Sequence, residues 1–239
     1  MKIGIAQTKP VTGDISRNIQ HHQNLIDQAA GTGVGILIFP ELSLTGYEPT
    51  LAHSLAVHID DNRLNVFQQL SDSHQMIIGA GIPTRHGEQI CISMVIFQPH
   101  QPRQLYSKKY LHADEEPFFV TGQHGTNRLG EGIALAICYE ITIQQHVEEA
   151  FADGAKIYIA SVAKSLRGIN KALERLSQIA NKYAMTVLMS NAVGQADGEE
   201  CAGKSSIWNN NGELLAQLDG LREGILILDT DTARTSVIY

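Results

Sequence analysis

The stretch Gly132-Ile133-Ala134-Leu135-Ala136-Ile137-Cys138-Tyr139-Glu140 begins with an apolar run whose length suits a buried strand. From residue 143 to residue 152 the apolar residues adopt helical spacing. A buried strand followed by a helix is the repeating unit of α/β proteins. The stretch therefore predicts an α/β fold and places Cys138 where the strand gives way to the helix.

The same alternation continues on both sides of this stretch. Helices are predicted over residues 14–31, where Asp14 can cap the first turn, and over residues 51–70 and 170–183. Residues 194–203 are predicted to form a polar loop. Because short turns separate the last three strands, the sheet should contain antiparallel neighbours and be mixed. The predicted strands are residues 2–7, 34–39, 76–82, 91–97, 104–106, 132–138, 156–162, 185–190, 205–208, 213–218 and 224–229.

Two further segments place reactive side chains after apolar strands. Pro40 ends one strand and Glu41 follows it, at the carboxyl edge where open α/β sheets bind ligands. Apolar neighbours should desolvate this carboxylate and raise its pKa, which suits proton exchange near neutrality. Lys108 and Lys109 lie in a segment rich in charge and aromatic residues, and an ammonium there could stabilise negative charge on a carbonyl oxygen.

Each of these residues also has an ordinary structural explanation when it is taken alone. A glutamate after a strand or a lysine in a loop is usually a surface charge, and most free cysteines are small buried side chains. Cys138 differs from Cys91, inside a predicted strand, and Cys201, in a polar loop. At a strand–helix junction, backbone N–H groups can favour a thiolate, so Cys138 is the candidate nucleophile.

The composition favours a globular protein and argues against a nucleic-acid-binding or membrane-spanning one. The 239 residues, 43% hydrophobic and 18% charged, suit a single globular domain over residues 1–239. A net charge of −7, with no basic run longer than Lys108-Lys109, argues against nucleic acid as a partner. The apolar runs are too short for a membrane span, and the N-terminal residues read as a strand rather than a signal peptide. We therefore expect a cytoplasmic protein.

The cysteines and histidines argue against metal chemistry and disulfides. The three cysteines are widely spaced without a C-x-x-C pair, and the ten histidines show no ligand spacing such as H-E-x-x-H. We expect no metal and no cofactor.

In this order, the three segments resemble the carbon–nitrogen hydrolase (nitrilase-like) superfamily, whose members carry a Glu, a Lys and a Cys at the ends of separate strands. The matching motifs are Phe39-Pro40-Glu41 with Thr45-Gly46-Tyr47, Tyr106-Ser107-Lys108 with Leu111, and Ile137-Cys138-Tyr139-Glu140. Further similarity extends from Ile3-Gly4-Ile5-Ala6-Gln7 to Glu223-Gly224, so it covers essentially the whole chain.

The resemblance implies a four-layer αββα sandwich with two mixed β-sheets, commonly assembled as a homodimer or higher homo-oligomer. It also implies that Glu41, Lys108 and Cys138 form the catalytic set and cleave a small-molecule amide through a cysteine thioester. Some relatives add a second glutamate after the Lys motif, and Glu115 fits that position better than Glu116, which remains open. The positions expected to contact substrate are Tyr47, Tyr139, Glu140 and Val162.

Departures from the family pattern leave the substrate open. Tyr110 replaces a frequent His, and residues 141–143 replace a frequent Arg-Phe-Pro. The stretch from Ala160 to Ala163 lacks the usual Pro-aromatic pattern. An amide is favoured over a nitrile because Tyr139 follows the nucleophile where nitrilases generally have Trp. The alternatives are an N-carbamoyl or ω-amide (glutaminase-like) hydrolase, or a catalytically silent relative that binds a metabolite.

Overall fold

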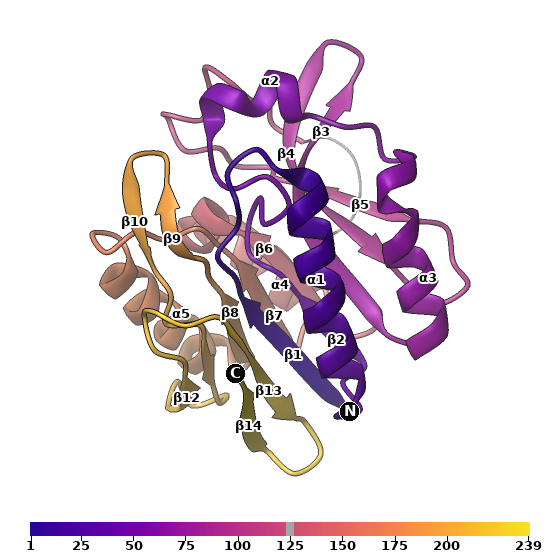
Figure 1. The fold of residues 1–239 in the computed structure, drawn as a ribbon. Coiled ribbons are helices and arrows are strands. Elements are labelled where there is room, and N and C mark those ends of the chain that lie inside the picture. The colour runs from indigo at the N-terminus through magenta and orange to yellow at the C-terminus, as the bar shows by residue number, and fades with distance from the viewer. Residues whose placement is uncertain (123–126) are drawn as a thin grey trace.

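The computed structural model describes residues 1–122 and 127–239 (Figure 1). In these residues the helices are α1 Ile15–Ala30, α2 Ala52–Leu55, α3 Asn65–His74, α4 Gln144–Ala152 and α5 Ile169–Tyr183, with 3-10 helices η1 Pro49–Leu51, η2 Asn62–Leu64 and η3 Cys138–Thr142. The strands are β1 Lys2–Gln7, β2 Ile36–Ile38, β3 Ile77–His86, β4 Gln89–Phe97, β5 Gln104–Ser107, β6 Ile133–Ile137, β7 Ile157–Ser161, β8 Thr186–Ser190, β9 Val193–Ala196, β10 Glu199–Ala202, β11 Ser206–Trp208, β12 Leu214–Gln217, β13 Gly224–Asp229 and β14 Arg234–Ile238.

Two large mixed sheets are built from the described residues. One has the strand order β14-β13-β1-β2-β3-β4-β5 and the other the order β12-β11-β8-β7-β6. In the first sheet β1, β2 and β3 are parallel, and in the second β6, β7 and β8 are parallel. The remaining neighbours are antiparallel, so the mixed arrangement predicted from the short C-terminal turns is confirmed.

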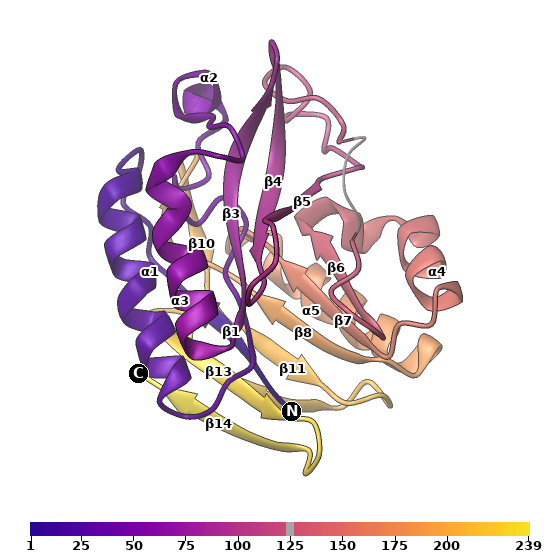
Figure 2. The ribbon, with the colours of Figure 1, turned by 90° about the vertical axis from the view of Figure 1, so that its right-hand side faces the viewer.

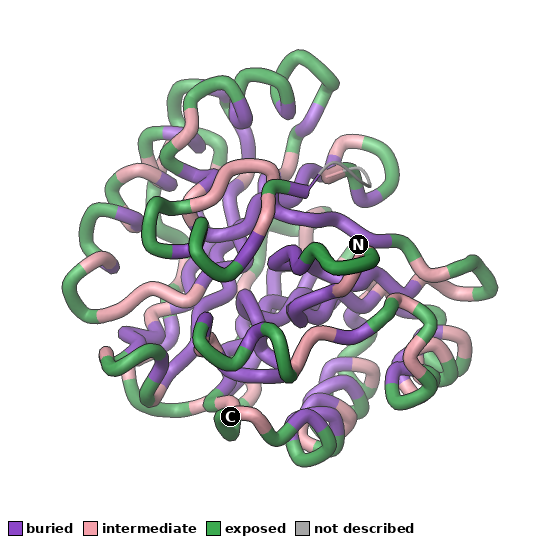
Figure 3. The backbone as a smooth tube through the Cα atoms, turned by 90° about the horizontal axis from the view of Figure 1, so that it is seen from above, coloured by how far each residue is buried: buried purple, intermediate pink, exposed green. Residues whose placement is uncertain are grey.

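The two sheets pack face to face between two layers of helices (Figure 2). Side chains of β2 show why, because Ile36 and Ile38 join the core between the sheets while Leu37 and Phe39 pack on the opposite side, under α1 and α3. This alternation follows from the period of two in a strand. On the other side, α4 and α5 cover the second sheet. The strands at the centre are accordingly buried (Figure 3), and the expected αββα sandwich is confirmed.

Two serine side chains join the sheets where their parallel strands end. The Ser161 hydroxyl at the end of β7 donates to the Phe39 carbonyl at 2.8 Å, and the Ser190 hydroxyl at the end of β8 donates to the Ala6 carbonyl at 2.6 Å. The carboxyl ends of parallel strands from both sheets therefore meet at one edge. Side chains that follow these strands are brought together there.

Two predicted segments were wrong in detail, and one strand was not predicted. The helix predicted over residues 51–70 is interrupted, because the chain leaves α2 and Val57 pairs with Thr84 as an isolated parallel bridge beside β3. The loop predicted over residues 194–203 is a hairpin of β9 and β10. A further strand, β14, completes the first sheet beside β13, although its side chains are exposed or only half-buried and therefore give little apolar signal.

Among the described residues, no helix combines the length and the apolar character that crossing a bilayer requires.

Candidate active site

Glu41 follows β2 in a tight turn that packs against β3. A side chain at Gly81 of β3 would lie 2.4 Å from the Leu42 nitrogen, so only glycine allows this approach. The His22 ring of α1 stacks on Phe39 at a centroid distance of 4.0 Å and supports the strand end from the helix side. The turn directs Glu41 into the interior, where the residue is 3% exposed.

Lys108 follows β5 and is completely buried. Its backbone N–H donates to the Ile92 carbonyl at 2.8 Å, and its carbonyl accepts from Gly122 at 2.7 Å, so the chain is held on both sides. The Lys108 ammonium donates to Glu41 Oε1 at 2.8 Å and to Glu115 Oε1 at 2.6 Å. One cation thus lies between two carboxylates.

Glu115, rather than its neighbour, is the second carboxylate of this cluster. Besides Lys108, its Oε1 accepts from the Tyr47 hydroxyl at 2.9 Å, and its Oε2 accepts from the His112 backbone N–H at 2.7 Å. Glu116 is exposed at the surface. Of the two glutamates that the sequence left open, Glu115 is therefore the one that contacts Lys108.

Cys138 lies at the end of β6 and begins η3. Its φ of 45° is in the left-handed region, which is uncommon for a residue with a side chain and is often found at functional sites. The residue is 9% exposed, and its accessible surface faces a cavity. A strained strand–helix turn of this kind presents the sulfur to whatever occupies the cavity.

Glu140 maintains this turn from within the protein. It is completely buried, its Oε2 accepts from the Ile137 N–H at 2.8 Å and the Tyr106 hydroxyl at 2.7 Å, and its Oε1 accepts from the Lys109 N–H at 2.6 Å. These bonds tie the end of β6 to the segment that carries Lys108. Glu140 therefore sets the spacing between the candidate nucleophile and the buried lysine.

The electrostatics of the cluster suit proton transfer. Burial raises the pKa of Glu41, and the positive charge of Lys108 opposes that effect. For Lys108, burial lowers the pKa, but the surrounding negative charges of Glu41, Cys138 and Glu115 prevail and raise it, so the side chain stays an ammonium. Burial also raises the pKa of the Cys138 thiol, and the charge of Glu41 adds to this effect. The raised pKa values of Glu41 and Cys138 both favour the protonated form of the side chain, so the two groups can share one proton beside the Lys108 ammonium.

One oxygen of Glu41 is unoccupied by the protein. Oε1 accepts from Lys108, whereas the buried Oε2 has no hydrogen-bond partner within residues 1–122 and 127–239. A buried carboxylate oxygen normally has a partner. This one is available to take a proton.

The sequence matches the family described as carbon-nitrogen hydrolase over residues 2–238. The chain belongs to the carbon-nitrogen hydrolase family. The expected resemblance is confirmed, and with it the enzyme class, a hydrolase acting on carbon–nitrogen bonds other than peptide bonds.

Individual relatives of this hydrolase are distant. It is 26% identical to the glutamine-dependent NAD(+) synthetase of Acinetobacter baylyi over 96% of the chain, but it spans only 44% of that protein. It is 24% identical to the hydrolase in agr operon of Staphylococcus aureus, covering 92% of this chain and 87% of the relative. A variant of the amidase from Nesterenkonia sp. AN1, solved with butyramide, has the same fold at TM-score 0.87, 21% identity, and coverage of 98% and 92%.

The cavity beside Cys138 has a volume of about 360 Å³, which suits a small organic molecule. Of the four residues expected to contact substrate, Tyr47 and Tyr139 line it. Glu140 and Val162 are completely buried and lie outside its lining. Glu115 also reaches the cavity wall, whereas Glu41 and Lys108 lie behind it.

Lys164 is a lining residue that the sequence analysis of this hydrolase did not select. It follows β7, the neighbour of β6, so its position after a parallel strand resembles that of Glu41 and Cys138. A charged residue two positions after the buried run that ends at Val162 was the available signal.

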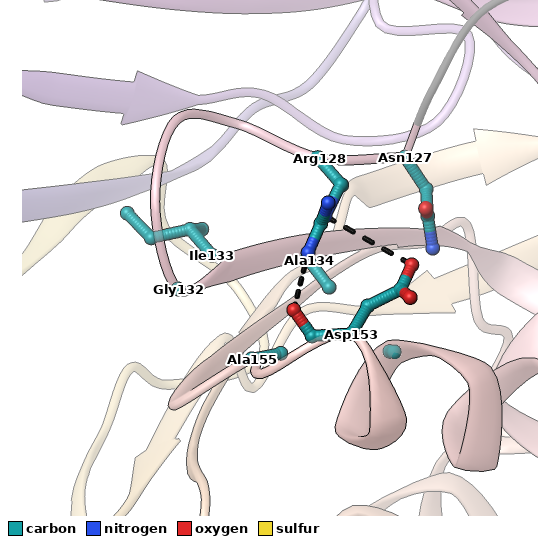
Figure 4. Close-up of a pocket in the computed structure, with 8 residues that line it drawn as sticks. Asn127, Arg128, Gly132, Ile133, Ala134, Asp153 and Ala155 are labelled. Atoms are coloured by element: carbon teal, nitrogen blue, oxygen red, sulfur yellow. Dashed lines mark hydrogen bonds and ion pairs between the residues drawn. The ribbon is translucent and has the colours of Figure 1, made fainter.

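A second hollow in this hydrolase lies at the opposite end of β6 (Figure 4). Arg128 crosses it, donating to the Asp153 carbonyl and placing its Nε 3.9 Å from Asp153 Oδ2. Its volume of about 10 Å³ holds about one water molecule. It is too small for a substrate.

Proposed function

We propose that this hydrolase cleaves small-molecule amides, with Cys138 as nucleophile, Glu41 as general base and Lys108 as the partner of the carbonyl oxygen. The observation that carries the proposal is the free Oε2 of Glu41, in a cluster whose other polar atoms are engaged. The cavity beside Cys138 supplies the space for a substrate.

The reaction begins when Glu41 accepts the proton of the Cys138 thiol. The sulfur then forms a bond to the amide carbonyl carbon, and the carbonyl π electrons move to oxygen. The Lys108 ammonium and the backbone N–H of Tyr139 stabilise that oxygen; one such donor contributes about 2.7–4 kcal/mol in comparable sites.

Collapse of the intermediate breaks the carbon–nitrogen bond. Glu41 returns its proton to the leaving nitrogen, which departs as ammonia or an amine and leaves a thioester on Cys138. A water molecule, deprotonated by Glu41, hydrolyses the thioester and restores the thiol. Glu115 keeps Lys108 in place through both halves of the reaction. Tyr47 and Tyr139 form the walls that position the substrate.

The function is tested by incubating the protein with a panel of aliphatic amides, ω-amides such as glutamine, and N-carbamoyl amines. Ammonia is measured enzymatically, carbon dioxide is measured separately, and intact-protein mass spectrometry detects an acyl group on Cys138. Ammonia without carbon dioxide supports an amidase, whereas equal amounts of both support the carbamoyl alternative. If no compound is hydrolysed and no acyl-enzyme forms, the chain is better described as a silent metabolite-binding relative.

The second carboxylate gives a prediction with a built-in control. Glu115→Gln keeps an oxygen that can accept from Tyr47 but removes the charge that holds Lys108, so kcat should fall by about 10²-fold. Glu116→Gln, one residue away and exposed, should change kcat by less than about twofold. Steady-state ammonia release measures both. Equal effects of the two substitutions would contradict the role of Glu115.

A further inference from the structure

Lys164 is a second lysine at the candidate nucleophile, and its backbone is held firmly. The Lys164 N–H donates to Asn191 Oδ1 at 2.7 Å, and its carbonyl accepts from the Ala202 N–H at 2.9 Å and from Asn191 Nδ2 at 3.2 Å. Asn191 also donates to the Gly203 carbonyl at 2.7 Å. A surface lysine on a loop has no such framework, so the position of Lys164 is built into the fold.

The Lys164 side chain lines the same cavity as Cys138. No carboxylate lies within 4.0 Å of its ammonium in the part of the chain that the structure describes. The negative charge of Cys138 is the main cause that raises the pKa of Lys164; burial opposes it, and the charge of Glu41 and a hydrogen bond with the Cys138 side chain add to it. The sulfur is therefore the main electrostatic partner of this lysine.

The charges around Cys138 show why a second cation, in addition to Lys108, would stabilise the thiolate. Lys108 lies between Glu41 and Glu115, so when the proton of Cys138 has moved to Glu41, the charge of Lys108 is balanced by Glu115. The thiolate then remains as an uncompensated anion in a buried site, which is costly. Lys164 supplies the missing positive charge and makes the cluster neutral.

We propose that Lys164 is a further catalytic residue, whose ammonium contacts the sulfur of Cys138 and stabilises the thiolate as its proton passes to Glu41. The proton moves from sulfur to Glu41 Oε2, and Lys164 keeps its own protons throughout. This role rests on the proposed function for turnover, but stabilisation of the thiolate is measurable without any amide substrate.

The test is alkylation of Cys138 by iodoacetamide and by iodoacetate between pH 5 and 10, followed by peptide mass spectrometry. The proteins are wild type, Lys164→Met, Lys164→Gln and Lys164→Arg, with Lys156→Met as control. Lys156 is an exposed lysine that precedes the other end of the same strand, β7. Thermal melts verify that each variant is folded, and two neutral substitutions guard against failure of one of them.

In Lys164→Met and Lys164→Gln, the midpoint of the alkylation profile should move up by about one pH unit, which corresponds to about tenfold slower labelling at pH 7. In these two variants the rate of labelling by iodoacetate, which is an anion, should fall further than the rate of labelling by neutral iodoacetamide. Lys164→Arg and Lys156→Met should keep the wild-type profile.

A wild-type profile in both neutral variants would overturn the proposal. So would an unchanged profile combined with a raised KM for anionic amides alone, because that result assigns Lys164 to substrate binding. If the profile shifts as expected while no amide is hydrolysed by the wild-type protein, the proposed function fails and the role of Lys164 at the sulfur stands.

Discussion

Replacing Cys138 with alanine is expected to reduce amide hydrolysis by about 10⁶-fold, the scale seen when a catalytic nucleophile is removed. The fold should remain, because alanine and cysteine meet the same strain at a φ of 45° and only the sulfur is lost from the cavity wall. Ammonia release measures the rate, and thermal melting followed by circular dichroism measures stability.

Cys201→Ala is the matched control. Cys201 is also buried and lines the same cavity, and burial raises its pKa to about 12, so it remains a thiol at neutral pH. This variant should keep the wild-type rate within a few-fold. Turnover by Cys138→Ala within 100-fold of wild type, with a normal melting curve, would exclude a thioester on this residue.

The second large effect is expected for Lys108→Met, which should lower both rate and stability. The ammonium bridges Glu41 and Glu115 in the interior, so its removal leaves two buried carboxylates without the cation that joins them. Loss of one partner from a buried ion cluster typically costs about 3–5 kcal/mol in unfolding free energy. Turnover should fall by about 10²–10³-fold or more, because the carbonyl oxygen loses a charged donor.

The stability loss should depend on pH in a defined direction. Burial already raises the pKa of Glu41, and Lys108 is the main group that lowers it, so the variant raises that pKa further. A carboxyl whose pKa is higher in the folded than in the unfolded state has no effect on stability below the unfolded pKa, destabilises the fold increasingly as pH rises from that value to the folded pKa, and remains fully destabilising above it. Lys108→Met should therefore be closer to wild type in stability at pH 5 than at pH 8.

Two companion variants test whether the effects of Lys108→Met come from the lost charge or from the altered packing. Adding Glu115→Gln to Lys108→Met removes one of the uncompensated carboxylates and should recover part of the stability but none of the activity. Lys109→Met, at the adjacent and partly exposed lysine, should leave both properties near wild type. Chemical denaturation measures the unfolding free energy of each variant, and ammonia release measures its turnover. Equal effects of the substitutions at Lys108 and Lys109 would contradict the proposed role of Lys108.

Local patterns were sufficient for much of the fold. Three local features are each specified within a few residues: the apolar run of β2, the apolar run of β6, and the Asp14 cap of α1, whose side chain accepts from the Arg17 N–H at 3.0 Å. Glu41 and Cys138 were identified by their positions after predicted strands, whereas Lys108 was selected over Lys109 by the resemblance of its motif to the family. The interrupted segment near Val57 was missed because its pairing partner, Thr84, is distant in sequence.

The sequence by itself determined the fold class, the family and the three candidate reactive residues, because strand ends and motifs are local features of the chain. The tertiary structure alone decided which groups meet. It placed Glu115 rather than Glu116 on Lys108, directed Glu140 into the interior, and brought Lys164 to the cavity of Cys138. Distances between charges depend on how two sheets pack, and that packing is the joint result of side chains spread over the whole chain.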